Sequence, residues 1–557
     1  MPLNDAVLKG TPCFNFAAGA AEGGTFDSAS RAPWSAVFSG AAEKLALVDG
    51  DFAVALPGDH GRADLAIDRF ARQTLCWTQR NGSLQVAERA DQFGATDLDP
   101  QAIYDYLFFH AIPSPRTIFK DVNRLPPGHH GVFDGSKMTV KPFGRLHFKP
   151  DASPSYDALK IEFRQLLTQA VKNELESGVP ACFLSGGTDS STVAGHIKQV
   201  AGEVHTYSIG FDAEGYDEME YARLAARHFG AQHHEYYVTP DDLVRSIADV
   251  AGSYDQPFGN SSVLPAYYCA LRAREDGVGK LLAGDGGDEL FGGNSRYAAQ
   301  KVYGYWDQVP GFLRSGLIEP VLAIPGADKI GVLRKGRNYV RDAKIGLPDR
   351  LHHYNLLLRL GADQVLSKEF LAQVRPESVA DQQRHVWSLA TATNQLDRML
   401  AYDWRYTLAE SDLPKVRGAT NLAGVKVGYP LLDDALTDFS MRLPESYKLK
   451  GSKLRWFFKE ALRDFLPEAI ITKQKKGFGL PFGVWATKHA ALKALASDSV
   501  RSFGTRGVVR PDFVKALLEQ HLPEHPGYYG EMVWVLMMME QWLRVHAPDW
   551  RFRGADQ

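Results

Sequence analysis

Apolar residues in the middle of the chain recur in alternating helical and strand-like patterns. From residue 156 to residue 176 they stand mostly three or four positions apart, which predicts an amphipathic helix. The apolar run at 181–184 predicts a short buried strand, and another helix is expected through residue 197. Further elements are predicted as strands at 204–211, 234–238 and 280–283 and as a helix at 221–229. Strands that alternate with helices predict a parallel sheet with both faces covered.

The first 150 residues follow a different pattern, with short apolar alternations that are typical of strands. The segment 46–56, ALVDGDFAVAL, predicts two strands around a turn at Asp49-Gly50. Two more strand-like pieces and one helical piece are expected at 62–77, 84–88 and 103–109. We therefore predict a β-rich domain at 1–150 and an α/β domain at 151–557, which is mainly helical beyond residue 300.

Length, charge and cysteine usage narrow the class of protein. A chain of 557 residues is typical of two or more domains. Its formal net charge of -3 gives no basic excess that would favour nucleic acid as a partner. Cys13, Cys76, Cys182 and Cys269 form no CxxC pair, which is typical of free thiols in a reducing compartment. The sequence has no signal-peptide pattern, and its apolar run at 532–539 predicts a packed helix instead of a membrane span. We expect a cytoplasmic protein that acts neither on membranes nor on nucleic acid.

A glycine-rich loop, Ser185 to Ser191 (SGGTDSS), lies between the predicted strand at 181–184 and the helix after it. Gly186 and Gly187 free the backbone to bring N–H groups close to a ligand, and the helix N-terminus adds partial positive charge. These features predict a phosphate-binding loop in which Asp189 stands where a phosphate-bound Mg²⁺ would lie. The loop carries no lysine, which disfavours transfer of the γ-phosphate. It resembles the loop of the PP-loop pyrophosphatases, which split ATP between the α- and β-phosphates.

A second glycine-rich loop is acidic, and the segment 281–293 reads LLAGDGGDELFGG. It follows a predicted strand of the same sheet, so we expect it at the carboxyl edge, where ligands bind in such sheets. A magnesium ion on pyrophosphate needs a second carboxylate beside Asp189, and Asp288 is the residue that we expect there. Asp285 is expected to face the reacting carboxylate or amine.

The two loops together resemble those of the asparagine synthetase family. Further segments match the family in the same order: YSIGF at 207–211, DQPF at 255–258, PLLD at 430–433 and KQKKGFG at 473–479. The resemblance implies an α/β fold with a β-rich, Ntn-hydrolase-like N-terminal domain. A PP-loop synthetase domain with a parallel sheet and a helical C-terminal part would follow it.

The resemblance also implies a reaction. ATP adenylates a carboxylate, pyrophosphate leaves, and a nitrogen nucleophile then gives an amide and AMP. ATP and Mg²⁺ are the implied cofactors, with Asp189 and Asp288 as metal ligands and Asp285 as a catalytic residue. Lys475 would stabilise negative charge at the α-phosphate, with Lys473 beside it, although both are also compatible with a solvated basic turn. The residues expected to contact ATP are Leu184, Ser185, Gly186, Gly187, Asp189, Ser190, Ser191, Ser208, Ile209, Gly210 and Gly284.

The N-terminal part departs from the family pattern. Members that hydrolyse glutamine begin Met-Cys-Gly-Ile, whereas this sequence begins Met1-Pro2-Leu3 and contains no Cys-Gly-Ile. Its first cysteine, Cys13, is followed by Phe-Asn-Phe. We expect a degenerate glutaminase-like domain without a catalytic cysteine, unless a wrongly assigned start removes the motif.

The segment 415–433, KVRGATNLAGVKVGYPLLD, also departs from the family. Typical members carry Asp, Arg, Glu and Arg where this chain has Arg417, Gly418, Lys426 and Gly428. We expect these changes to reshape a polar surface near the active site and to disfavour plain aspartate as the substrate. Drift of helix-packing positions is the alternative. Asn260, where many members have Asp, points weakly in the same direction.

The leading hypothesis is an amide-forming ligase that uses ammonia or a substrate amine. Three versions stay open: an intramolecular cyclase similar to lasso-peptide macrolactam or β-lactam synthetases, a ligase that amidates a sugar acid or natural-product acid, and an ammonia-dependent asparagine synthetase. The partner would be a small-molecule or peptide carboxylate, and a precursor peptide, a partner protein or a second copy of the chain is compatible. A PP-loop enzyme that modifies RNA is an alternative from a different class, which the charge and the missing CxxC pair disfavour.

Overall fold

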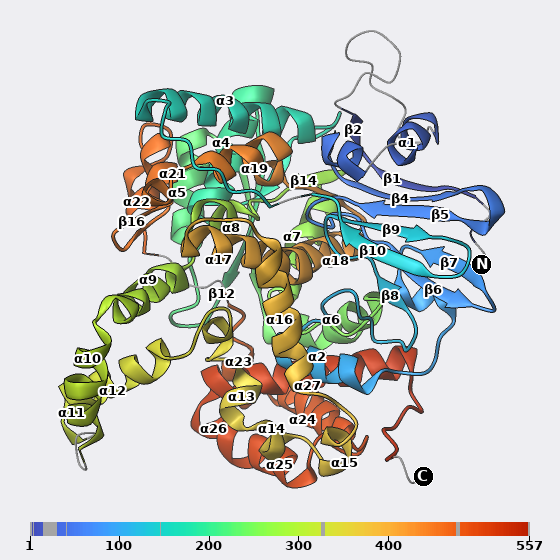
Figure 1. Ribbon diagram of the computed structural model, residues 1–557, viewed down its shortest axis with the longest axis vertical. Helices are drawn as coiled ribbons and strands as arrows, with labels where there is room; N and C mark the ends of the chain where they lie inside the picture. Colours follow the sequence, from blue (N-terminus) through green and yellow to red (C-terminus); the bar gives the residue numbers. More distant parts are fainter. Residues whose placement is uncertain are drawn as a thin grey trace.

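The computed structural model describes residues 3, 5–14, 31–39, 42–144, 146–324, 329–474 and 479–554. Figure 1 shows a strand-rich N-terminal part, a central sheet covered by helices and a layer of C-terminal helices. The predicted fold class, α/β with a β-rich N-terminal part and a helical C-terminal part, is confirmed.

The described residues of the N-terminal part form an antiparallel sheet in the order β1-β4-β5-β9-β10. Its strands are β1 (Val7–Gly10), β4 (Phe52–Pro57), β5 (Ala63–Ile67), β9 (His129–Phe133) and β10 (Met138–Pro142). A smaller sheet, β7-β6-β8, consists of β6 (Cys76–Arg80), β7 (Ser83–Ala87) and β8 (Asn123–Arg124). The strand-like pieces predicted at 62–77 and 84–88 are therefore confirmed.

The turn predicted at Asp49-Gly50 is present, and Gly50 has a φ of 87° that favours glycine. Strands β3 (Val48–Asp49) and β4 flank it, but they do not pair with each other. β3 pairs with β2 (Cys13–Phe14), whereas β4 pairs with β1 and β5. The two strands predicted around this turn are therefore present, and the distant segment that contains β1 and β2 supplies a partner strand to each.

The helix predicted at 103–109 is α2 (Pro100–Phe109). It begins where the Asp99 side chain accepts a hydrogen bond from the N–H of Gln101 and Pro100 occupies the first turn. Buried side chains of α2 share a hydrophobic core with the C-terminal helix α27 (Pro526–His546), and the Tyr106 hydroxyl donates to the Val535 carbonyl at 2.8 Å. The N-terminal part is thus attached to the C-terminal helices, and the domain boundary near residue 150 stays a prediction.

The central sheet is parallel, in the order β13-β12-β11-β14-β15. The strands predicted at 181–184, 204–211, 234–238 and 280–283 are confirmed. They are β11 (Ala181–Phe183), β12 (His205–Phe211), β13 (Gln232–Val238) and β14 (Lys280–Leu282), and β15 (Lys426–Gly428) completes the sheet.

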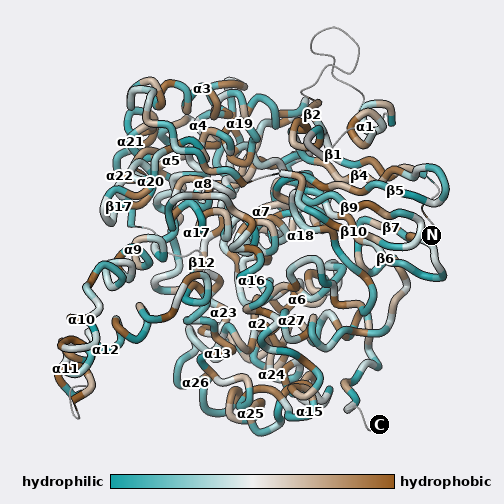
Figure 2. The backbone as a smooth tube through the Cα atoms, viewed as in Figure 1, coloured by the Kyte–Doolittle hydropathy of each residue, from teal (hydrophilic) through white to brown (hydrophobic). Residues whose placement is uncertain are grey.

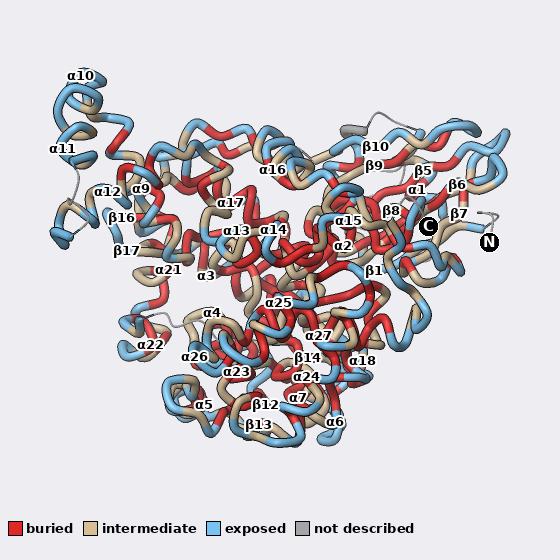
Figure 3. The backbone as a smooth tube through the Cα atoms, turned by 90° about the horizontal axis from the view of Figure 1, so that it is seen from below, coloured by how far each residue is buried: buried red, intermediate tan, exposed pale blue. Residues whose placement is uncertain are grey.

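Alternate residues of the central strands enter two separate hydrophobic cores. Ala181 and Leu281 belong to one core, whereas their neighbours Cys182 and Leu282 belong to the other. The first core includes residues of α6 (Pro240–Ser253), α7 (Val263–Glu275) and α18 (Leu413–Ala423). The second includes residues of α3 (Tyr156–Glu174), α4 (Thr188–Ala201) and α5 (Met219–Phe229). Helices therefore cover both faces of the sheet, as predicted, and Figure 3 shows the buried residues concentrated between these layers.

Beyond residue 300 the chain is mainly helical, as predicted. After α9 (Ser295–Gln308) an arm projects from the body, as Figure 1 shows. The arm consists of α10 (Gly311–Leu313), the π-helical segment η4 (Arg314–Ile318), α11 (Glu319–Ala323) and α12 (Gly331–Ala343). Figure 2 shows hydrophobic positions along the arm. The side chains of Phe312, Leu317 and Val332, which belong to the arm, are exposed.

The apolar run at 532–539 lies inside α27, where its side chains are buried. The prediction of a packed helix is therefore confirmed. None of the helices that the structure describes combines the length and the apolar character needed to cross a membrane.

We expect Asp397→Ala to lower the free energy of unfolding by about 3–5 kcal/mol, because it leaves a buried ammonium without its partner. Asp397 in α17 (Gln395–Asp403) and Lys448 in α20 (Glu445–Lys448) form an ion pair of 2.6 Å with both side chains 0% exposed. Equilibrium unfolding in urea measures the loss. The matched change Lys426→Ala removes an exposed pair with Glu176 and should cost about 1 kcal/mol or less. Equal losses in the two variants would contradict this expectation.

Candidate functional site

The two glycine-rich loops meet at one edge of the central sheet. The first follows β11 and leads into α4, and the second follows β14 and leads into α8 (Gly287–Phe291). Because β11 and β14 are parallel neighbours, both loops leave the same edge. A Cβ atom on Gly284 would lie 2.8 Å from the Ser190 nitrogen, and one on Gly287 would lie 2.1 Å from Asp189 Oδ1. The contact between the loops therefore requires glycine at both positions.

Hydroxyl groups organise the first loop in front of α4. The Ser185 N–H donates to Ser190 Oγ at 3.1 Å, and the N–H of Gly187 donates to Ser185 Oγ at 3.3 Å. Gly186 has a φ of 67°, and a Cβ there would lie 2.4 Å from the Ala222 nitrogen. The loop is thus held in a shape that only glycine allows, with hydroxyl and N–H groups at the positive end of a helix.

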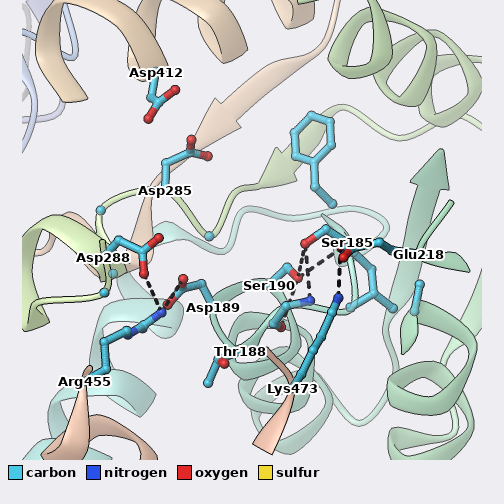
Figure 4. Close-up of a pocket in the computed structure, with 18 of the residues that line it drawn as sticks. Ser185, Thr188, Asp189, Ser190, Glu218, Asp285, Asp288, Asp412, Arg455 and Lys473 are labelled. Atoms are coloured by element: carbon cyan, nitrogen blue, oxygen red, sulfur yellow. Dashed lines mark hydrogen bonds and ion pairs between the residues drawn. The ribbon is translucent and has the colours of Figure 1, made fainter. Parts of the chain in front are cut away.

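Arg455 joins the carboxylates that were predicted as metal ligands. Its Nη1 lies 2.7 Å from Asp189 Oδ2 and 3.0 Å from Asp288 Oδ1, and its Nη2 also bonds Asp189 (Figure 4). Arg455 is 5% exposed, and its guanidinium lies 4.0 Å from the Phe458 ring centroid. Burial lowers the pKa of Arg455, but the two carboxylates outweigh this effect and hold it above its ordinary value. Asp189 and Asp288 are therefore close enough to share one cation.

Arg455 was not predicted as a site residue. It lies 266 positions from Asp189 along the chain, just after the short hairpin β16 (Leu449–Lys450) and β17 (Lys453–Leu454). A single arginine between a turn and an apolar helix has no distinctive pattern, so only the folded arrangement identifies it.

Asp285 lies in a second group of charges. The Lys415 ammonium in α18 lies 3.5 Å from Asp285 Oδ1 and 2.9 Å from Asp412 Oδ1. Burial raises the pKa of Asp285 above its ordinary value, and the Lys415 cation opposes that shift. Burial alone would lower the pKa of Lys415, but Asp412 and Asp285 hold it above its usual value. Lys415 and Asp412 were not predicted as site residues.

Lys473 contacts the first loop. Its Nζ donates to Glu218 Oε2 at 3.0 Å, lies 3.5 Å from the Gly186 carbonyl oxygen and stands 4.2 Å from the Tyr221 ring centroid. Figure 4 shows it beside Ser185 and Ser190, apart from Asp285 and Asp288. Lys475, the predicted catalytic lysine, lies outside the described residues.

A cavity of about 1270 Å³ lies between these loops and residues of the segments 412–416 and 452–474. The predicted residues that line it are Leu184, Ser185, Gly187, Asp189, Ser190, Ser208, Ile209, Gly284, Asp285, Asp288 and Lys473. Gly186, Ser191 and Gly210 are not in its wall. Ser191 is fully buried in α4, and a Cβ on Gly210 would meet the Tyr237 ring at 2.6 Å. Packing therefore accounts for the small residues at these two positions.

The four family departures in α18 and β15 do not line the cavity, so they do not change its wall directly. Their effect on the choice of substrate stays a prediction. Arg417 turns to the N-terminal part, where its Nη1 donates to the carbonyls of Ala71 at 3.0 Å and Arg72 at 2.8 Å. Lys426 is exposed and pairs with Glu176. Successive helix residues point in different directions, so Lys415 faces the cavity while Arg417 faces away. Asn260 does line the cavity.

The donor set is compatible with magnesium. Within the described part of the chain, no group of three or more His, Cys, Asp or Glu residues is arranged to hold a metal ion. Mg²⁺ commonly uses one or two carboxylates together with substrate phosphates, and Asp189 and Asp288 already gather on a cation beside the phosphate-type loop.

Comparisons with known proteins agree with this geometry. The family model described as asparagine synthase matches residues 162–544, and the model of the glutamine amidotransferase domain matches residues 35–144. The chain is 24% identical to the glutamine-hydrolyzing asparagine synthetase 1 of Bacillus subtilis over 486 residues, which cover 86% of this chain and 74% of that protein. It is 26% identical to the amidase chyE of Penicillium rubens over 487 residues, which cover 79% and 71% of the two chains. With the glutamine-hydrolyzing asparagine synthetase B of Escherichia coli it shares 32% identity over 162 residues, 25% of this chain and 29% of the other.

The chain belongs to the asparagine synthase family, because the family model covers more than half of it. The predicted family and the glutaminase-like scaffold of the N-terminal part are thereby confirmed. Members of the family are ligases that use ATP for amidation.

We expect Lys415→Met to move the acidic limb of the pH–activity profile upward by about one unit or more. Removing the cation disfavours the ionised form of Asp285, so its pKa rises and the carboxylate is lost at a higher pH as the solution is acidified. The pH dependence of amide formation measures the limb. Lys415→Arg should leave it nearly in place, as should Lys426→Met, which removes an exposed lysine outside the cavity. If the acidic limb is unchanged in Lys415→Met, the prediction that Asp285 is a catalytic carboxylate is contradicted.

Proposed function

We propose that this protein is an AMP-forming carbon–nitrogen ligase that adenylates a carboxylate and couples it to an amine or to ammonia. The observation that carries the proposal is the meeting of the hydroxyl-rich glycine loop with the acidic loop in one large cavity. The first loop supplies donors for phosphate groups, and the second supplies carboxylates within reach of the same space.

ATP would lie between the N-terminus of α4 and strand β12, which form two parts of the cavity wall. Ser185, Gly187 and Ser190 would hold the β- and γ-phosphates at the N-terminus of α4. Ser208 and Ile209 of β12 line the neighbouring wall and would contact the adenine. This arrangement would direct the α-phosphate toward the acidic loop, where a carboxylate substrate can approach it.

Mg²⁺ would be held by Asp189 and Asp288, which bond one cation in this structure. When bound, the metal neutralises charge on the pyrophosphate group and so makes it a better leaving group. Arg455 keeps the two carboxylates together, and a fixed guanidinium beside the phosphates also stabilises negative charge.

The proposed reaction has two steps. A carboxylate oxygen of the substrate bonds to the α-phosphorus, and the bond between that phosphorus and the bridging oxygen breaks to release pyrophosphate. The amine nitrogen then bonds to the acyl carbon, AMP leaves, and the nitrogen loses a proton. Asp285 would accept that proton, with Lys415 holding its carboxylate in place. Lys475 would stabilise charge on the α-phosphate, as the family resemblance implies.

The nitrogen would come from free ammonia or a substrate amine instead of glutamine hydrolysis at Cys13. Cys13 lies on β2, and burial together with Asp49, Asp434 and Asp433 raises the pKa of its thiol. A thiolate is the nucleophilic form, so these acidic neighbours disfavour catalysis.

The cavity is large enough for two substrates. Small-molecule pockets commonly measure about 300–1,000 Å³. The cavity of about 1270 Å³ exceeds that range for one ligand, so ATP and an acid substrate fit in it together. Intramolecular cyclisation of a peptide, amidation of a sugar acid or natural-product acid, and ammonia-dependent asparagine synthesis are all compatible with this volume.

Asp189→Ala should reduce pyrophosphate release from ATP at least about 100-fold, because it removes a carboxylate at the leaving group. ATP–pyrophosphate exchange with aspartate, uronic acids and peptide acids identifies the substrate and provides the assay. Asp249→Ala removes an exposed carboxylate of α6 outside the cavity and should retain full exchange. Exchange that persists in Asp189→Ala would contradict the mechanism.

Cys13→Ala should change amide formation less than about twofold, because the thiol is not the nucleophile that supplies nitrogen. The assay compares product formed with ammonium, with glutamine and with the acid's own amine. If product formation depends on glutamine and is lost in Cys13→Ala, the Cys13 thiol is the nucleophile that releases nitrogen from glutamine. The other cysteines, Cys76, Cys182 and Cys269, are buried and are not substituted.

A further inference from the structure

A second pocket lies at the base of the arm, away from the loops described above. It encloses about 530 Å³ between the end of α9, the segment after α12, α16 (Glu377–Leu389) and the start of α17. Two indole rings, those of Trp306 and Trp387, form part of its wall. The volume is within the range of small-molecule sites.

Cationic side chains dominate this pocket. Arg314, Lys344, Arg350 and Arg398 line it, and Asp307 is the carboxylate among the lining residues. Lys344 also pairs with Glu319 at 2.9 Å, outside the lining. The chain as a whole has a net charge of -3, so a pocket wall with this excess of cations is a local feature.

Arg350 is the most informative of these residues, because it is only 3% exposed. Its Nε donates to Gln300 Oε1 at 2.5 Å and its Nη1 to the Ala343 carbonyl at 3.0 Å. Among the described residues, no carboxylate forms an ion pair with it within 4.0 Å. Burial lowers the pKa of Arg350, in contrast to Arg455, whose carboxylate partners raise it. The Tyr303 ring, 5.1 Å from the guanidinium, and the charge of Asp307 offset only part of the cost of burying this cation, and a bound anion would offset more of it.

The pocket is distinct from the cavity that holds the glycine loops. Helix α9 passes between them, with Ser295 at its first turn lining the cavity and Trp306 near its end lining the pocket. At 1.5 Å per residue these positions are about 16 Å apart along the helix. Figure 1 shows α9 leading from the body of the protein into the arm.

We propose that this pocket binds a small anionic molecule, one that carries phosphate or carboxylate groups, between Arg350, Arg398 and Lys344. Arginine forks match both kinds of oxyanion through paired hydrogen bonds. The indoles of Trp306 and Trp387 would cover the uncharged part of the ligand.

The test uses the full chain labelled with fluorotryptophan. Fluorine resonances of Trp306 and Trp387 report on the pocket, and that of Trp456 reports on the main cavity, which it lines. Single Trp→Phe variants assign the three signals. Sodium phosphate, sodium citrate and sodium chloride are titrated at equal ionic strength. Specific binding of an anion is thereby distinguished from general screening of charges by salt. We expect saturable shifts of the Trp306 and Trp387 signals with phosphate or citrate and none with chloride.

Variants locate the anion. The double change Lys344→Gln and Arg398→Gln removes two exposed cations of the pocket and should weaken binding by about tenfold or more. The control Arg384→Gln removes an exposed arginine of α16 that pairs with Asp349 outside the pocket, and it should leave binding unchanged. If only phosphate shifts the two signals, the ligand carries phosphate groups. If only citrate shifts them, the ligand is a polycarboxylate.

Shifts that chloride reproduces, shifts that the double variant leaves undiminished, or no shift with either anion would overturn the proposal. ATP titration followed at Trp456 tests the proposed function independently. If Trp456 responds to ATP while Trp306 and Trp387 respond to neither anion, the proposed anion site is contradicted and the proposed ligase function is not.

Discussion

The ion cluster of Arg455, Asp189 and Asp288 holds the candidate site together. Two carboxylates from neighbouring loops repel each other in a partly buried space, and the guanidinium between them offsets that repulsion. Arg455 is also fixed through its backbone, since its N–H donates to the Gly292 carbonyl at 3.2 Å. The C-terminal part of the chain is thereby joined to both loops of the central sheet, and the cavity between them keeps its shape.

Close packing of backbone makes this cluster possible. A Cβ atom on Gly293 would lie 1.7 Å from Asp288 Oδ1, and one on Gly287 would lie 2.1 Å from Asp189 Oδ1. Any larger residue at these positions would push the carboxylates apart. The glycines of the acidic loop therefore have a steric role in addition to flexibility, and they place two like charges where one cation can serve both. The proposed Mg²⁺ and ATP would add their charges to this cluster, in which one guanidinium already balances two carboxylates.

The sequence predicted those features that depend on local patterns. The strands at 181–184 and 280–283 and the loops after them are contiguous, and the rule that ligands bind at the carboxyl edge placed Asp189 and Asp288 together. Arg455 and Lys415 were not predicted, because each reaches the site from a distant part of the chain and no sequence spacing relates it to the loops. Arg417 contacts the N-terminal part instead of the cavity, and the sequence does not show which side of α18 faces the cavity.

Helix α18 links the site to the N-terminal part. Lys415 points to Asp285 and Asp412, and two residues later Arg417 donates to the carbonyls of Ala71 and Arg72. A shift of the N-terminal part along this helix would move Lys415 with it, because a helix transmits displacement as a rigid rod over so short a distance. The contact of the glutaminase-like scaffold with α18 therefore fixes the lysine that holds Asp285. The described residues of the N-terminal part influence the geometry of the site in this way, although none of them lines the cavity.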